Sequence, residues 1–482
     1  MKLYHECIIK ILAALSFFVA ITACGSLPPI SAEETKHYIA VEPNGELAAV
    51  RKTSTKGDEK INIPEDLVDD DEVYKNIIEQ IEKHPKKNAE GKIEVLIYVH
   101  GGLNTKSDAL NRVRSTYQKI LDESDMYPVF VNWRTGPFSS YGSHLVKIRQ
   151  GEVSETAPLT SPVYFVTDAI ETVVNAPKSW IVNGRAALQS IRKSEVDESE
   201  RRLLQYVEPH DNGNIFYENE NTEISAIDGI KNFFKNFFAW WITSPVKAAT
   251  TPIAYTMGRP TWDVMLRRTN TAFYTPSDLE PQELEAGYLL SNHGNGAFLR
   301  FLKKLSLAKH DENLPITVTL MGHSMGAIII NRVLALDLDL EVSNIVHLAS
   351  ADSIKNLLGT VAPYLIKNPT TDFYSLSLHP NNENRERSSL FGIPGLLPSG
   401  SLLNWIDNMY TTPETVIDKR SGSWSNIERT LALIPDRARE KMFFKVFGET
   451  PEFMDGDFVI SPQKHGDFGY MRFWDKDQWW SE

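Results

Sequence analysis

Short runs of apolar residues alternate with amphipathic stretches along much of this chain. The runs are nearly continuous, as is typical of strands buried on both faces of a parallel sheet, and they lie at 94–99, 128–133, 316–320, 344–349, 372–378 and 442–447. Apolar residues at helical spacing predict helices over 70–83, 107–122, 325–336 and 353–366. Strands and helices in this order predict an α/β fold, in which helices flank a mostly parallel sheet.

Two long stretches interrupt this alternation. Residues 138–312 are far too many for a connection and predict an inserted subdomain, in which the polar stretch 193–223 is interpreted mostly as loop. A second insertion separates the last two strands. The expected organisation is a signal segment at 1–23, a tether at 24–36, core at 37–137, a helical insertion at 138–312, core at 313–383, a second insertion at 384–439, and a final strand, loop and closing helix at 440–482.

Two smaller patterns complete the outline. Tyr38–Glu42 and Glu46–Val50 flank Pro43-Asn44-Gly45, which predicts a strand pair around a turn. In the helical insertion, an aromatic stripe at helical spacing predicts an amphipathic helix; it comprises Ile230, Phe233, Phe234, Phe237, Phe238 and Trp241. Such a stripe most often packs into a core, and a lid or a face toward a membrane is the alternative.

The only two cysteines, Cys7 and Cys24, lie at the start of the chain, so no disulfide framework or catalytic thiol is expected after them. Lys2 and Lys10 precede an apolar run over Ile11–Ile21, which ends in small residues. This pattern predicts a secretory signal peptide, because a membrane span needs roughly 20 apolar residues.

The sequence Ile21-Thr22-Ala23-Cys24 resembles the lipobox of bacterial lipoproteins. The resemblance implies cleavage before Cys24 and acylation of that residue, which would anchor the protein to a membrane of the cell envelope. Gly25 stands where an aspartate usually directs retention in the inner membrane, so the resemblance points to the outer membrane.

Charge and composition narrow the function. The formal net charge of −13 argues against a general nucleic-acid binder, which needs basic surface to displace counterions. The histidines show no HExxH spacing, and neither a P-loop nor a complete dinucleotide fingerprint occurs. We therefore expect no metal and no cofactor, and the oligomeric state stays open.

Gly322-His323-Ser324-Met325-Gly326 fits the pattern G-x-S-x-G and lies between a predicted strand and a predicted helix. In this context a sharp turn lifts the serine Oγ above the edge of the sheet, which predicts that Ser324 is a nucleophile. An oxyanion would need backbone N–H donors, one from Met325 and one from Leu103 or Gly102 in the turn His100-Gly101-Gly102-Leu103.

The general base is expected C-terminal to the serine and after the final strand. His465 satisfies both conditions, whereas His347 lies within a predicted strand and His379 comes too early. For the acid, Glu383 follows the strand at 372–378, and Asp352, which follows the preceding strand, is the alternative. Asp455, Asp457 or the absence of an acid are the remaining alternatives.

Together the segments His100-Gly101-Gly102, Gly322–Gly326 and His465-Gly466-Asp467-Phe468 resemble those of α/β-hydrolases, over roughly 93–134 and 315–475. The resemblance implies an α/β-hydrolase fold with a lid-like helical insertion. It also implies a serine esterase or lipase that cleaves a small-molecule or lipid ester through an acyl-enzyme on Ser324. The rival hypothesis is an envelope lipoprotein without catalysis, which uses the same fold for binding or scaffolding.

Overall fold

The computed structural model describes residues 30–48, 53–56, 59–62, 70–146, 148–149, 152–153, 156–181, 214–218, 251–274, 295–311, 313–390, 393–451 and 453–480. Cys24 and the predicted helix at 230–241 lie outside these ranges. Among the described residues, no helix has both the length and the apolar character that a membrane crossing requires.

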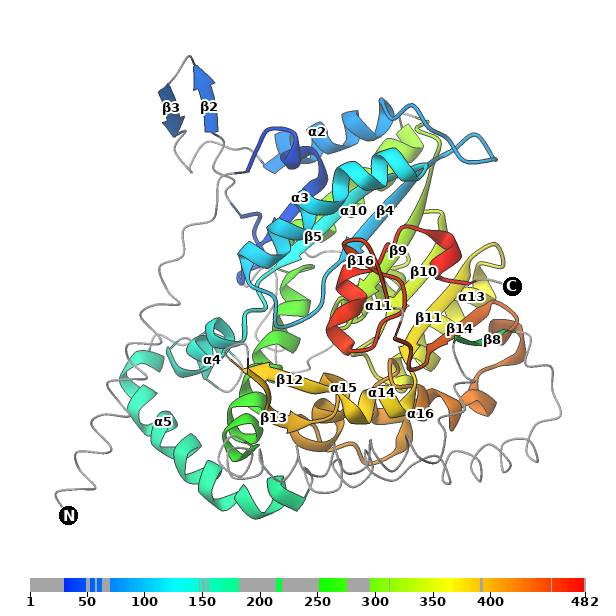
Figure 1. Ribbon diagram of the computed structural model, residues 1–482. Helices are drawn as coiled ribbons and strands as arrows, with labels where there is room; N and C mark the ends of the chain where they lie inside the picture. Colours follow the sequence, from blue (N-terminus) through cyan, green and yellow to red (C-terminus); the bar gives the residue numbers. More distant parts are fainter. Residues whose placement is uncertain are drawn as a thin grey trace.

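An eight-stranded sheet forms the centre of the protein (Figure 1). Its strand order is β1-β5-β4-β9-β10-β11-β14-β8, and every neighbouring pair is parallel. The strands are β1 (Tyr38–Val41), β4 (Ile93–Val99), β5 (Met126–Trp133), β8 (Ile215–Glu218), β9 (Ile316–His323), β10 (Val342–Leu348), β11 (Asp372–Leu378) and β14 (Met442–Phe447). The expected α/β class with a mostly parallel sheet is confirmed.

Both faces of the central strands are buried, which explains their continuous apolar sequences. In β4, Val95 and Ile97 belong to one apolar cluster, while Leu96 and Tyr98 belong to the cluster on the other face. The flanking helices include α2 (Asp70–Glu82), α3 (Lys106–Glu123), α10 (Ala297–Asp311), α11 (Gly326–Ala335), α12 (Ile354–Asn356) and α13 (Ala362–Lys367). A single π-helical turn, Leu357–Val361, joins the last two.

The helix α10 belongs to the core by its contacts, although its sequence falls in the range assigned to the insertion. Phe298 and Leu302 are fully buried in the larger apolar cluster. The Tyr74 hydroxyl on α2 donates to the Ala297 carbonyl at 2.8 Å. The chain therefore returns to the core at α10, before the strand β9.

Three predictions of local structure differ from the structure. Tyr38–Val41 joins the edge of the main sheet beside β5. In the described part of the second segment, residues 46–48, pairing with the first is limited to an antiparallel bridge between Leu47 and Val41 and the hydrogen bonds beside it. Ile215–Glu218, in a stretch interpreted mostly as loop, pairs with β14 as the strand β8. The predicted closing helix is instead two 3-10 segments, His465–Tyr470 and Lys476–Gln478. Four-residue strands at a sheet edge carry too few positions for a pattern to stand out.

The remaining helices and hairpins lie mainly in the two insertions. In the first insertion these are α4 (Pro137–Val146), β6 (Ile148–Arg149), β7 (Glu152–Val153), α5 (Ala157–Val174) and a helix over 251–271. The second insertion holds α14 (Pro380–Arg385), the hairpin β12 (Arg387–Leu390) and β13 (Ile393–Ser399), α15 (Leu402–Trp405), α16 (Trp424–Glu428) and α17 (Asp436–Arg439). Two further hairpins are β2 (Thr53–Lys56) with β3 (Glu59–Asn62) and β15 (Met454–Asp455) with β16 (Phe458–Val459).

Candidate active site

Ser324 occupies the sharp turn between β9 and α11. Its φ of 52° lies in the left-handed region, which costs an ordinary L-residue roughly 1–2 kcal/mol. Two glycines make the turn possible: a Cβ on Gly322 would lie 2.5 Å from the Ala327 nitrogen, and one on Gly326 would lie 2.1 Å from the Val99 oxygen. The glycines of the G-x-S-x-G pattern are therefore required by close backbone contacts.

The structure brings Ser324 and His465 together from positions 141 residues apart in sequence. The Ser324 Oγ lies 2.9 Å from the His465 Nε2. Ser324 is 1% exposed and His465 is 6% exposed, so the pair is shielded from water. Burial lowers the pKa of His465 to about 4, and the imidazole is therefore neutral at neutral pH, which leaves one ring nitrogen able to accept a proton.

The backbone of His465 is held from both sides. Its N–H donates to the Glu386 Oε2 at 2.9 Å, and its carbonyl lies 3.2 Å from the His323 Nε2. Burial holds the pKa of His323 well below its usual value, so a neutral ring whose Nε2–H donates fits this contact. These contacts fix the loop that carries His465 against the turn that carries Ser324.

Neither of the carboxylates expected to orient the base contacts it. Glu383 is buried, and its Oε2 accepts from the Ser423 hydroxyl at 2.8 Å. Asp352 is also buried; its two oxygens accept from the Asn331 and Asn356 amides, at 2.6 and 2.7 Å, and from the Ser353 N–H. Both residues thus serve other partners in this structure.

The other residues considered at the same step also lie apart from the pair. Asp455 is exposed and faces Arg472 at 3.5 Å, and Asp457 is exposed. His347 is buried in β10 with its ring edge-on to Phe373. His379 precedes α14, and its Nδ1 accepts from the Asn381 N–H at 3.2 Å. None of these side chains bonds to Ser324 or His465 among the described contacts.

Glu386 is the carboxylate that the sequence analysis missed. It follows α14 and accepts the His465 N–H, while the His465 Nδ1 is buried without a hydrogen-bond partner in the described structure. Burial raises the pKa of Glu386 to about 7, partly offset by that N–H. A signal existed in the sequence, because Glu386 lies only three residues after Glu383, just inside the range assigned to the second insertion.

The turn after β4 lies directly against Ser324. A Cβ on Gly101 would be 2.8 Å from the Ser324 Cβ, and a Cβ on Gly102 would be 2.8 Å from the Met325 sulfur. The Leu103 N–H donates to the Thr135 carbonyl at 3.1 Å, so it is already used. No acceptor is found for the N–H groups of Gly102 and Met325 among the described residues, and these two form the candidate oxyanion site.

Apolar side chains surround this turn. Met325 is buried, and the Met265 sulfur, from the helix over 251–271, lies 3.5 Å from the position of a Cβ on Gly102. The same helix is tied to the loop after β5, because the Arg268 guanidinium donates to the Arg134 carbonyl and the Ser140 hydroxyl. The described part of the first insertion thus covers the candidate site with an apolar side chain.

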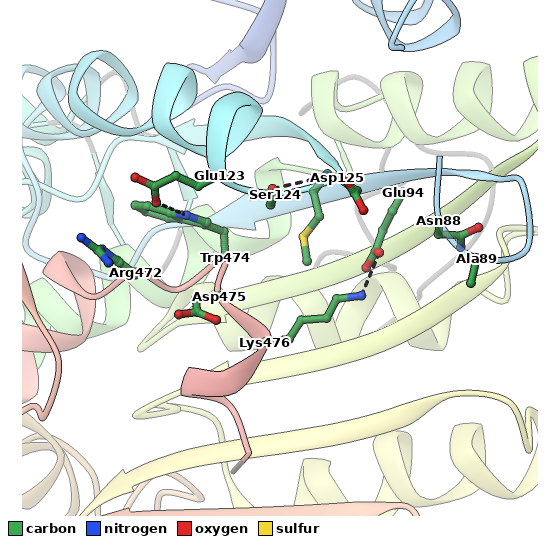
Figure 2. A pocket seen from close by; sticks show the side chains of 11 residues that line it. Asn88, Ala89, Glu94, Glu123, Ser124, Asp125, Arg472, Trp474, Asp475 and Lys476 are labelled. Atoms are coloured by element: carbon green, nitrogen blue, oxygen red, sulfur yellow. Dashed lines mark hydrogen bonds and ion pairs between the residues drawn. The ribbon is translucent and has the colours of Figure 1, made fainter. Parts of the chain in front are cut away.

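A polar cavity of about 550 Å³ lies at the opposite end of the sheet (Figure 2). Glu94, at the start of β4, lines it, and its Oε2 accepts from the Lys476 Nζ at 2.9 Å. The Trp474 indole donates to Glu123 in the same cavity at 3.1 Å. Since β4 and β9 each span seven or eight residues, the cavity lies roughly 20 Å or more from Ser324.

Within the described residues, no group of three or more histidine, cysteine or acidic side chains is placed to hold a metal ion. No family model, no curated protein and no solved structure matches this chain. The interpretation of the site therefore rests on its geometry.

Proposed function

We propose that this protein is a serine hydrolase with an α/β-hydrolase fold, and that it cleaves carboxylic esters through an acyl-enzyme. The observation that carries the proposal is the 2.9 Å contact between the Ser324 Oγ and the His465 Nε2 at a left-handed turn before a helix. A strained serine beside a neutral, buried imidazole is the arrangement in which a hydroxyl is activated as a nucleophile.

In the proposed reaction, the Ser324 Oγ attacks the carbonyl carbon of the ester and His465 takes the hydroxyl proton on Nε2. The negative charge that forms on the carbonyl oxygen faces the N–H groups of Gly102 and Met325. When the intermediate collapses, the ester C–O bond breaks and His465 gives the proton to the leaving alcohol. Water then attacks the acyl-enzyme by the same route and releases the acid.

We assign Glu386 as the residue that orients His465. Its carboxylate accepts the backbone N–H of His465, and the Nδ1 of that residue is the ring nitrogen still without a partner. A carboxylate oxygen brought to Nδ1 by rotation of the Glu386 side chain would stabilise the imidazolium formed during attack. Glu386 replaces Glu383 and Asp352 in this role, because those two are committed to Ser423 and to the two asparagines.

An apolar acyl group suits the covering residues best, because Met265 and Met325 lie beside the candidate oxyanion site. Hydrolysis of p-nitrophenyl esters of increasing chain length tests both the activity and this preference. We expect turnover by the wild type, none by Ser324→Ala, and a higher kcat/KM for butyrate or longer chains than for acetate. Turnover that is equal in Ser324→Ala would refute the proposal, and a preference for acetate alone would refute the apolar acyl site.

The rival function is an envelope lipoprotein that uses this fold only for binding. One observation favours it, namely that the His465 Nδ1 has no partner in the described structure. Ester hydrolysis distinguishes the two functions. An enzyme hydrolyses the ester and loses this activity in Ser324→Ala, whereas a binding protein shows no activity in either form.

We further propose that Cys24 is acylated and anchors the protein to a membrane of the cell envelope. The support is the sequence Ile21-Thr22-Ala23-Cys24 after an apolar run. Growth with an alkyne-labelled fatty acid tests this: the label is expected on the wild type and absent from Cys24→Ser.

A further inference from the structure

The helix α5 has its polar and apolar sides reversed relative to a surface helix of a soluble protein. Two of its polar residues face inward: the Asp168 carboxylate accepts from the Tyr141 hydroxyl of α4 at 2.7 Å, and the Ser161 hydroxyl donates to the Leu145 carbonyl at 2.6 Å. A surface helix ordinarily places such residues outward and buries its apolar stripe.

The outward side of α5 and of the helical segment after it, residues 176–181, is apolar. Eight large apolar side chains there are between 48% and 82% exposed: Leu159, Val163, Val166, Ile170, Val173, Val174, Trp180 and Ile181. We call these residues the α5 face. Among the exposed positions of 156–181, only Glu171 and Lys178 are charged. Figure 1 shows α5 along the outer margin of the molecule, beyond α4. A continuous exposed surface of this kind marks a site that is covered by something apolar.

We propose that the α5 face inserts into the surface of a lipid bilayer, parallel to the membrane plane. This inference rests on the proposed function in one respect, since acylation of Cys24 would hold the described chain, which begins at Ile30, within six residues of a bilayer. A lipid surface accepts a convex apolar helix without matching its shape. Trp180, at the end of the α5 face, is the residue type enriched at the boundary between lipid and water.

The alternative occupant, α5 of a second copy, fits the sequence less well. Leu159, Val163, Val166, Ile170 and Val173 have the spacing of a coiled-coil seam, but they span only about two heptads where a stable coiled coil sustains three to four. The flanking positions that carry ion pairs between coiled-coil helices are uncharged here: they are Thr160, Pro162, Thr167, Ala169 and Val174. Nothing in the helix specifies a register between two copies.

The first experiment is flotation of residues 24–482 with Cys24→Ser, in which neither the predicted signal segment nor an acyl chain can bind lipid, using vesicles of phosphatidylethanolamine and phosphatidylglycerol. We expect a fraction to float with the vesicles, and Val163→Glu with Ile170→Glu to lower the partition coefficient by at least about tenfold. The matched control is Thr167→Glu with Glu171→Gln, which keeps the formal charge of the helix and leaves the α5 face intact. Equal flotation of both double variants would overturn the proposal.

The second experiment places a fluorophore in the wild-type anchor background, at Ile170→Cys on the α5 face or at Lys303→Cys on α10. Doxyl-labelled lipids are expected to quench the first position at least about threefold more than the second. Absent quenching at position 170 would overturn the proposal. So would crosslinking between copies through position 170, which would assign the α5 face to a dimer. If the emission of the fluorophore at position 170 already reports an apolar environment without vesicles, another segment of this chain covers the α5 face.

Neither readout uses catalysis, so failure of the hydrolase proposal leaves the inference standing. Failure of acylation at Cys24 leaves the flotation result unchanged, because the Cys24→Ser chain carries no acyl anchor in that experiment; the fatty-acid labelling shows that failure separately. Circular dichroism and the melting temperature of each variant show whether a loss of flotation reflects unfolding.

Discussion

Three carboxylates at opposite ends of the central sheet differ in their partners: Glu94 lies at the amino end, and Glu383 and Glu386 lie at the carboxyl end. At the amino end, Glu94 is paired with the Lys476 ammonium and also accepts from the Thr319 hydroxyl at 2.7 Å. At the carboxyl end, Glu383 and Glu386 have no ion pair with any described residue, and burial raises their pKa values to about 8 and about 7. Carboxylates that change protonation near neutral pH are typical of functional sites, whereas paired ones mostly maintain structure. We therefore place the proposed chemistry beside Glu386, which contacts the His465 backbone, and give Glu94 a structural role at the amino end.

The largest effect is expected from the two residues that meet at the carboxyl end. Ser324→Ala or His465→Ala should lower kcat/KM for a p-nitrophenyl ester at least about 10³-fold, because each removes a group that takes part in bond making. The matched control is Ser353→Ala, which removes a cap from α12, should cost about 1 kcal/mol of stability, and should leave the rate within a few-fold. Comparable rates in Ser324→Ala and the control would contradict the assignment.

The next largest effect is expected from Glu386→Gln. We expect kcat/KM to fall about 10²–10⁴-fold, because a neutral amide does not stabilise the imidazolium of His465. In the wild type, the pKa of Glu386 near 7 means that the carboxyl loses its proton as pH rises through 7, so kcat/KM should rise there. The variant should lack that rise.

The control for this variant is Glu449→Gln. Glu449 is half exposed and pairs with Arg385, the residue directly before Glu386. Loss of the Glu449 charge should leave kcat/KM and the pH profile unchanged. A rate in Glu386→Gln within threefold of the wild type, with the same profile, would assign the orientation of His465 to another group.

A smaller effect, on stability alone, is expected from Glu383→Gln. Burial raises the pKa of Glu383 to about 8 in the folded protein, against an ordinary value of 4.5, so the folded state holds this proton more tightly than the unfolded state. Between these values the wild type should therefore lose stability as pH rises, by up to about 1.4 kcal/mol per pH unit relative to the variant. Chemical denaturation at pH 5, 6, 7 and 8 measures the difference. A difference that is constant with pH would show that Glu383 is ionised in the folded state.

The smallest effect is expected at the amino end. Lys476→Met removes the ion pair with Glu94, but the lysine side chain is 53% exposed, so water screens the interaction. We expect a loss of about 0.5–1 kcal/mol in the free energy of unfolding and no change in kcat/KM beyond twofold. A tenfold loss of kcat/KM would contradict the structural role given to the amino end of the sheet.

Much of the core could be predicted from the sequence because its signals are strong and local. The strands β4, β9, β10, β11 and β14 stand out as apolar runs, and each is buried on both faces. The position of Ser324 could be predicted from the G-x-S-x-G pattern, because any larger residue in place of Gly322 or Gly326 would clash with the backbone. His465 followed from its place after the last strand, and the structure places its ring beside Ser324.

Other features depend on contacts that no local pattern records. The strand β8 is a four-residue segment whose pairing with β14 is set by tertiary structure. Glu383 lies in the short helix α14 and accepts from the Ser423 hydroxyl, whereas Glu386 directly follows the helix and accepts the His465 N–H. Neither partner can be inferred from the local sequence. Leu103 was expected as a possible oxyanion donor, but the carbonyl of Thr135, from another strand end, takes its N–H.

Reaction with a fluorophosphonate, followed by mass spectrometry of the peptides, tests the central claim most directly, because the reagent forms a bond only with an activated serine. The account predicts one adduct, on Ser324, which forms in the wild type, slows at least about 10²-fold in His465→Ala, and is absent from Ser324→Ala. No adduct on Ser324 in the folded wild type, or an equal yield at another serine in Ser324→Ala, would contradict it.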